Sequence, residues 1–82
     1  MNLELIPVGE QCRILDIQGE AAAVRRAKEL GLVQGVVCRV VRKAPFHGPI
    51  ELAMSLGHIG IRTSDELRIE VEPLHLQRSE AA

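Results

Sequence analysis

Two histidines are the residues of this sequence best suited to hold a metal ion. His47 lies in a loop-like stretch and His58 opens a short strand-like one, so the imidazoles would meet if that loop folds toward the strand. Imidazole binds divalent iron and zinc, and Glu51 or Asp65 could complete such a site. A site for Fe²⁺ or Zn²⁺ is therefore one interpretation; the other is that both histidines are solvent-exposed residues near turns.

The two cysteines do not form a recognisable motif. Cys12 and Cys38 are far apart in the sequence, and neither belongs to a Cys-x-x-Cys pair. That spacing is typical of neither a zinc knuckle nor a dithiol redox site. Each lies in an apolar, strand-like stretch, where a free cysteine packs as a small hydrophobic residue. We therefore expect both to be part of the core.

Sequence motifs for catalysis are missing. A phosphate-binding loop requires Gly-x-x-x-x-Gly-Lys-Ser/Thr, whereas Gly57 and Gly60 have neither that spacing nor the lysine. The three histidines fall in a loop, a strand and a tail, so no nucleophile, base and orienting group are predicted to share a pocket. We expect a binding domain that is not an enzyme, with no catalytic residue and no required cofactor.

Charge and aromatic content argue against nucleic acid and membrane as direct partners. Ten basic and eleven acidic side chains give a net charge of −1, and Phe46 is the only aromatic residue, so stacking on bases is not available. Apolar residues occur in short groups, well below the ~20 in a row that span a bilayer. The first residues lack the pattern of a secretory signal, so we expect a cytoplasmic protein.

Hydrophobic periodicity predicts a small, mostly β domain. Alternating apolar residues favour about five short strands, near residues 12–17, 36–43, 50–54, 58–62 and 68–72. Imperfect alternation in the first of them suggests a bulge. Thr63 and Glu66 have capping-box spacing, which predicts a helical turn before the last strand. We expect a partly open barrel over residues 1–74, followed by a flexible tail over 75–82.

One short amphipathic helix is expected over residues 20–30. Ala23, Ala27 and Leu30 recur on one face of this segment, and charged residues occupy most of the remainder. Gly31 follows the last turn, where a left-handed residue commonly ends a helix, and Gly35 permits a tight turn before the next strand.

The segment from Ala44 to Pro49 must be a loop, since its two prolines and a glycine cannot supply a sheet ladder. At its centre, Phe46 is either an exposed anchor for a partner or a cap that folds back over the barrel.

Several short motifs, in this order and spacing, resemble the ferrous iron transport protein A (FeoA) family. They are Glu29-Leu30-Gly31-Leu32 followed by Gly35, Val40-Val41-Arg42-Lys43-Ala44-Pro45, Pro49-Ile50 and Ile59-Gly60-Ile61-Arg62. The similarity runs from about Leu3 to Val71. It implies an SH3-like barrel that acts as a cytoplasmic partner of the bacterial ferrous iron permease, which carries a GTP-binding domain. The matching residues Leu30, Gly31, Gly35, Ala44, Pro45 and Pro49 would be structural.

Two segments depart from the family pattern. Gln34 stands where relatives usually have a proline, and Phe46-His47-Gly48 replaces a segment that usually reads apolar-Gly-Asp. The second departure falls in the loop that we expect to touch the partner. The same barrel also occurs as a terminal domain of iron-dependent repressors, so metal sensing and self-association are compatible with the fold.

The leading hypothesis is an accessory protein that binds the cytoplasmic GTP-binding part of the permease. Its predicted contact residues lie on the helix and in the loop, and they are Arg25, Lys28, Pro45, Phe46, His47 and Pro49. The alternative is a module that senses or delivers Fe²⁺ or Zn²⁺ through His47 and His58. A self-associating module, or homo-oligomer, is a third interpretation.

Overall fold

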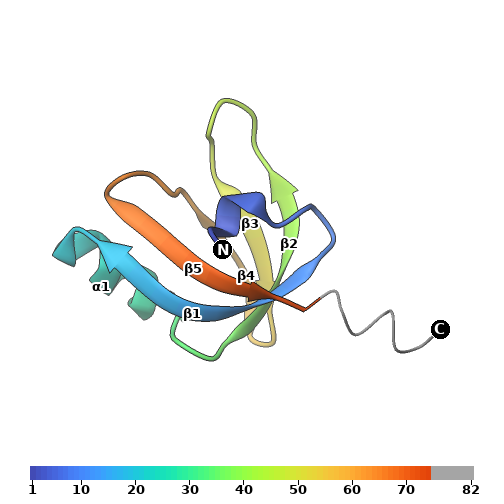
Figure 1. Ribbon diagram of the computed structural model, residues 1–82, viewed down its shortest axis with the longest axis horizontal. Coiled ribbons are helices and arrows are strands. Elements are labelled where there is room, and N and C mark those ends of the chain that lie inside the picture. The colour runs from blue at the N-terminus through green and yellow to red at the C-terminus, as the bar shows by residue number, and fades with distance from the viewer. Residues whose placement is uncertain (75–82) are drawn as a thin grey trace.

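Five antiparallel strands form one strongly curled sheet in the computed structural model, which describes residues 1–74 (Figure 1). The elements in chain order are the 3-10 helix η1 (Leu3–Leu5), β1 (Gln11–Gly19), α1 (Ala21–Glu29), β2 (Val37–Lys43), β3 (Ile50–Met54), β4 (Gly57–Ile61) and β5 (Leu67–Pro73). The strand order is β4-β3-β2-β1-β5, so β4 and β5 are the sheet edges. This confirms the mostly β fold class. The predicted tail over 75–82 lies outside the described residues.

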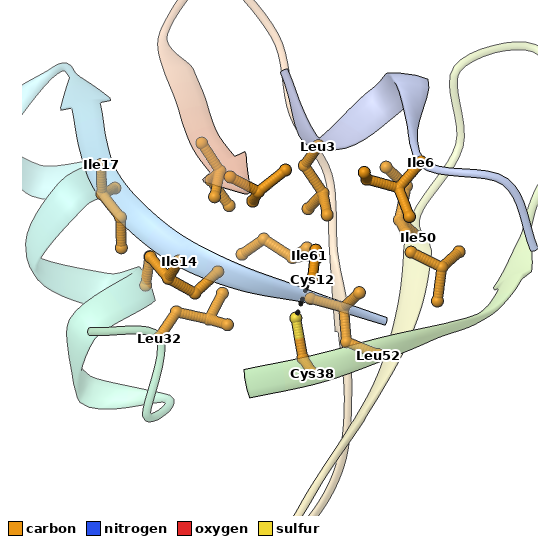
Figure 2. Packing of buried hydrophobic residues seen from close by; sticks show 14 of the residues in the cluster. Leu3, Ile6, Cys12, Ile14, Ile17, Leu32, Cys38, Ile50, Leu52 and Ile61 are labelled. Carbon is orange, nitrogen blue, oxygen red and sulfur yellow. Dashed lines mark hydrogen bonds between the residues drawn. The ribbon is translucent and has the colours of Figure 1, made fainter. Parts of the chain in front are cut away.

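The core is built by the period-2 alternation of the strands (Figure 2). On β2, Cys38 and Val40 are buried while Val37 and Val41 are exposed, as the sequence predicts. Leu3 from η1 enters the same core. Each fully buried Leu, Ile or Val contributes about 1.5–3 kcal/mol. No polar or charged residue among residues 1–74 is buried, so the core is packed from apolar side chains and the two cysteines.

The sheet consists of two halves that meet between β1 and β2. β1 pairs with β5 along most of its length, from Cys12 opposite Pro73 to Gly19 opposite Leu67. Within the named strands it shares three residue pairs with β2, centred on Cys12 opposite Cys38. Backbone hydrogen bonds extend this pairing at each end, from the Val40 N–H to the Glu10 carbonyl and from the Ile14 N–H to the Val36 carbonyl. The β1–β2 pairing joins the β1–β5 half, which carries α1, to the β2–β3–β4 half.

Two bulges increase the local twist of the sheet. The register of β1 against β5 shifts between Ile14 and Asp16, which confirms the predicted bulge in the first strand. A second shift, between Val40 and Arg42 of β2, was not apparent from the sequence. Bulges of this kind help a short sheet to curl into a barrel.

The predicted helical turn at residues 63–66 is wrong, because the chain makes a tight turn there. Ser64 and Leu67 exchange two backbone hydrogen bonds of 3.0 Å, and this reciprocal antiparallel pairing defines a hairpin-like turn rather than a helical one. The Glu66 N–H is accepted by Ser64 Oγ at 3.1 Å instead of by the expected cap. The Thr63 hydroxyl donates to the Glu4 carboxylate at 2.9 Å, which ties this segment to η1.

Helix α1 falls within the predicted range, but Leu30 does not enter the core. It is 42% exposed, whereas Leu32 is fully buried. Gly31 adopts a left-handed φ of 101° just after the helix. The Leu32 N–H then donates to the Ala27 carbonyl at 3.1 Å, and the Gly31 N–H donates to the Lys28 carbonyl at 3.0 Å. These two hydrogen bonds form a Schellman motif. The turn at Gly31 therefore delivers Leu32 to the core.

No helix in the described part of the chain is long and apolar enough to cross a membrane.

Candidate functional site

The loop between β2 and β3 ends in a strained hairpin turn. Gly48 N–H donates to the carbonyl of Pro45 at 3.1 Å, and the two residues between them, Phe46 and His47, both have φ of 58°. Positive φ at both central positions is the signature of a type I′ turn, which normally uses Asn and Gly. For L-residues with a Cβ this conformation costs about 1–2 kcal/mol each. The turn therefore retains strain that a Gly residue would remove.

Phe46 is placed at the tip of this turn with 97% of its surface exposed. It does not fold back to cap the barrel. An aromatic ring of this kind buries about 150–250 Å² when it is covered, so leaving it in water forgoes a large stabilisation. A strained turn that exposes the only aromatic side chain does not stabilise the isolated domain. A partner with an apolar pocket would bury the ring and so gain binding free energy from it.

The base of the loop is fixed to the barrel. Ala44 N–H donates to the carbonyl of Pro49 at 3.0 Å, which closes the loop neck. A Cβ on Gly48 would lie 2.7 Å from the Ala44 Cβ, so two small residues are needed where the strands of the loop approach each other. Lys43 Nζ donates to the Glu4 carbonyl at 2.8 Å and so links the loop to η1.

The helix presents a second, different surface. A groove of about 670 Å³ runs between α1 and the end of β1, and its lining includes the apolar Ile17 and Val24 and the charged Arg25, Lys28 and Glu29. Within residues 1–74, no carboxylate forms an ion pair with Arg25 or Lys28. The predicted contact residues on the helix are therefore accessible cations beside an apolar groove.

The loop and the helix do not form one continuous surface. Figure 1 shows the β2–β3 loop at the top of the molecule and α1 at its far left, on different halves of the sheet. Of the predicted contact residues, Pro45, Phe46, His47 and Pro49 come together and Arg25 and Lys28 lie apart from them. Leu30, Gly31 and Gly35 form the junction that follows the helix.

The two predicted metal-ligating histidines lie toward opposite ends of the β3–β4 hairpin. His58 is opposite Ala53, whereas His47 belongs to the loop that precedes Ile50, which pairs with Ile61 at the other end. Among residues 1–74, no group of three or more His, Cys, Asp or Glu side chains is arranged to hold a metal ion.

The two cysteines, by contrast, are brought together. Cys12 and Cys38 occupy directly opposed positions of β1 and β2, and their sulfurs share a hydrogen bond of 3.7 Å (Figure 2). Both are free and buried, as expected. The shared hydrogen bond, together with burial, raises the pKa of the Cys12 thiol. Sequence spacing missed this pair; the available signal was that both cysteines lie on the inward face of predicted strands.

The architecture places the chain among the SH3-like small β-barrels, as a curled five-stranded antiparallel sheet with one short helix. The sequence profile of the FeoA domain matches residues 1–73. The chain belongs to the FeoA family. None of the curated proteins compared with the chain matches it.

Solved structures of similar proteins agree with this assignment. The FeoA protein of Chlorobium tepidum is 31% identical, with a TM-score of 0.79 over 90% of this chain and 70% of that one. A FeoA-like protein of Clostridium acetobutylicum is 26% identical, with a TM-score of 0.76 over 90% and 86% of the two chains. The FeoA of Stenotrophomonas maltophilia, a prokaryotic SH3 domain protein solved in complex with zinc, is 29% identical, with a TM-score of 0.71 over 88% and 89%.

Proposed function

We propose that this protein is a non-enzymatic, cytoplasmic accessory protein of bacterial ferrous iron uptake that binds the cytoplasmic GTP-binding part of the ferrous iron permease. Membership of the FeoA family supports a role in ferrous iron transport. The Stenotrophomonas maltophilia relative has been suggested to act as a ferrous iron transport activating factor, which favours the same role here.

The observation that carries the proposal is Phe46 at the tip of its strained turn. Residues held in unfavourable backbone conformations are frequent at functional sites, where the surrounding structure maintains them. Here the closed neck of the loop and the link from Lys43 to η1 do so. A rigid, preorganised aromatic anchor loses little conformational entropy on binding, which favours affinity. Phe46 would enter an apolar pocket on the permease domain, flanked by Pro45, His47 and Pro49.

Arg25 and Lys28 would act differently from Phe46, because they lie on α1, away from the β2–β3 loop. Exposed charges at the edge of an interface mainly alter the association rate and its dependence on salt. We expect Arg25→Ala and Lys28→Ala to slow association with an acidic permease surface by a few fold at low salt. Stopped-flow measurements at low and high salt would separate this effect from loss of the Phe46 contact.

The decisive experiment is a calorimetric titration of the purified GTP-binding domain, with and without a GTP analogue, using two matched variants. Phe46→Ala removes the ring, and Leu56→Ala removes a side chain that is 99% exposed in the β3–β4 turn. A hot-spot residue contributes at least about 2 kcal/mol, or about 30-fold in Kd. We expect that loss for Phe46→Ala and none for Leu56→Ala. Unchanged binding by Phe46→Ala would overturn the proposed contact.

Zinc in the Stenotrophomonas maltophilia structure favours a second candidate, a module that senses or delivers Fe²⁺ or Zn²⁺. In this chain His47 and His58 are the proposed ligands; because they lie toward opposite ends of the β3–β4 hairpin, a shared site requires the β2–β3 loop to move. This candidate predicts stoichiometric uptake of Zn²⁺, and of Fe²⁺ under anaerobic conditions, that either His47→Ala or His58→Ala abolishes. Calorimetry without heat on addition of either ion would remove it.

A further inference from the structure

The buried cysteines occupy a backbone geometry that is close to that of a disulfide. Cys12 and Cys38 face each other, and the bonds from Ile14 N–H to the Val36 carbonyl (2.8 Å) and from Val40 N–H to the Glu10 carbonyl (3.0 Å) flank them on either side. That alternation makes the cysteines a hydrogen-bonded pair, with Cα atoms ~5.5 Å apart. Disulfides span Cα separations of about 4.4–6.8 Å. The sulfurs already lie at 3.7 Å.

We propose that Cys12 and Cys38 form a reversible intramolecular disulfide that links the two halves of the sheet. The pair sits at the centre of the pairing where β1 meets β2. A covalent bond at that point joins the half that carries α1 to the half that carries the β2–β3 loop. The inference rests on the geometry of the core and is independent of the partner proposed for Phe46.

Formation of the bond needs a two-electron oxidant, for which hydrogen peroxide serves. One thiolate attacks a peroxide oxygen, the O–O bond breaks, and a sulfenic acid and hydroxide are formed; the hydroxide takes up the proton that the thiol released. The second sulfur then attacks the sulfenic sulfur and expels water. Two thiols and one peroxide thus give one disulfide and two waters.

Strain makes this disulfide reversible rather than a permanent link. In directly opposed strand positions the Cβ atoms lie about 4.5–5.5 Å apart, which exceeds the ~3.8 Å preferred by a relaxed disulfide. The bond must therefore draw the strands together, and strained disulfides are easily reduced. Both cysteines are at most 1% exposed, so oxidants and reductants alike reach them only when the β1–β2 pairing opens, which slows formation and reduction of the bond equally. Cytoplasmic disulfides are typically transient in this way.

The test is an equilibrium titration of the full protein in glutathione buffers of increasing oxidation. The equilibrium is approached in two series, one that starts from the reduced protein and one that starts from protein refolded after peroxide treatment. Convergence of the two series shows that slow opening does not limit the result. After denaturation and alkylation, we expect the oxidised species to have lost two hydrogen atoms, to take up no alkylating agent and to yield a peptide linking Cys12 to Cys38. Dithiothreitol should restore both thiols.

Variants and amide exchange complete the test. Cys12→Ala and Cys38→Ala should each yield no linked peptide under the same buffers, because the one remaining thiol can only be alkylated or carry glutathione. In the wild type, the link should slow hydrogen exchange at the Ile14 and Val40 amides at least tenfold. Mixed glutathione adducts or intermolecular dimers without the Cys12–Cys38 peptide would overturn the disulfide. A disulfide without slower exchange at those two amides would overturn its role as a link between the halves.

Discussion

The two ends of strand β3 carry turns that expose a large apolar side chain in opposite conformational contexts. Before the strand, Phe46 is 97% exposed; after it, Leu56 is 99% exposed. The first turn places Phe46 and His47 at φ of 58°. In the second, the positive φ of 143° falls on Gly57, and no residue with a Cβ in residues 1–74 shares the conformation of Phe46 and His47. Only the first turn therefore carries left-handed strain.

This difference separates chance exposure from a candidate contact. Single exposed apolar residues such as Leu56 are common on protein surfaces and require no explanation. Phe46 combines the same exposure with an unfavourable backbone and with anchors to η1 through Lys43. Backbone conformation, added to exposure, therefore distinguishes the β2–β3 loop as the surface proposed to bind a partner.

The largest expected effect in stability comes from adding a methyl group to a glycine in each turn. A Cβ on Gly48 would lie 2.7 Å from Ala44 Cβ and 3.1 Å from the Pro45 carbonyl oxygen, whereas one on Gly57 meets nothing within 4 Å. Gly48→Ala should therefore destabilise by about 2–3 kcal/mol through overpacking. Gly57→Ala should cost only about 1 kcal/mol, from its positive φ. Urea unfolding measures both, and equal losses would contradict the steric argument.

Most of the fold could be predicted from the sequence because it depends on local alternation and turn chemistry. The faces of β2 and β5 and the bulge in β1 follow from spacing alone. The helical turn at 63–66 was a wrong prediction, since Thr63 contacts Glu4, which is remote in the sequence. The exposure of Leu30 was missed for a different reason. Helical periodicity cannot show that the chain reverses at Gly31 and sends Leu32 inward.

The candidate site was predictable only in part. The two prolines of the loop indicate a rigid turn, but the sequence could not decide whether Phe46 covers the barrel or faces solvent. That choice depends on the backbone of Phe46 and His47, which adopt a conformation that their residue types disfavour. The contact between Cys12 and Cys38 was missed because strand register, and not spacing, brings them together.

A smaller effect, with opposite signs at the two turns, is expected for substitutions to glycine. His47→Gly relieves a left-handed φ and should stabilise the domain by about 1 kcal/mol. Leu56 does not have a positive φ, so Leu56→Gly should destabilise by about 0.5–1 kcal/mol through the entropy of the unfolded chain. Thermal unfolding at matched concentration tests the pair. A loss of stability in both variants would mean that the β2–β3 turn holds no strain.

The smallest effect concerns the ion pair at the base of the β2–β3 hairpin. Arg42 Nε donates to Glu51 Oε2 at 2.7 Å, but the two side chains are 71% and 42% exposed, so water screens their attraction. Glu51→Gln should destabilise by about 0.5 kcal/mol at low salt. At 1 M salt, where the screening length is about 3 Å, the difference from wild type should disappear. A loss that persists at high salt would mean that Glu51 acts through its short-range hydrogen bond with Arg42 Nε rather than through screened charge, since Gln keeps the size of the side chain.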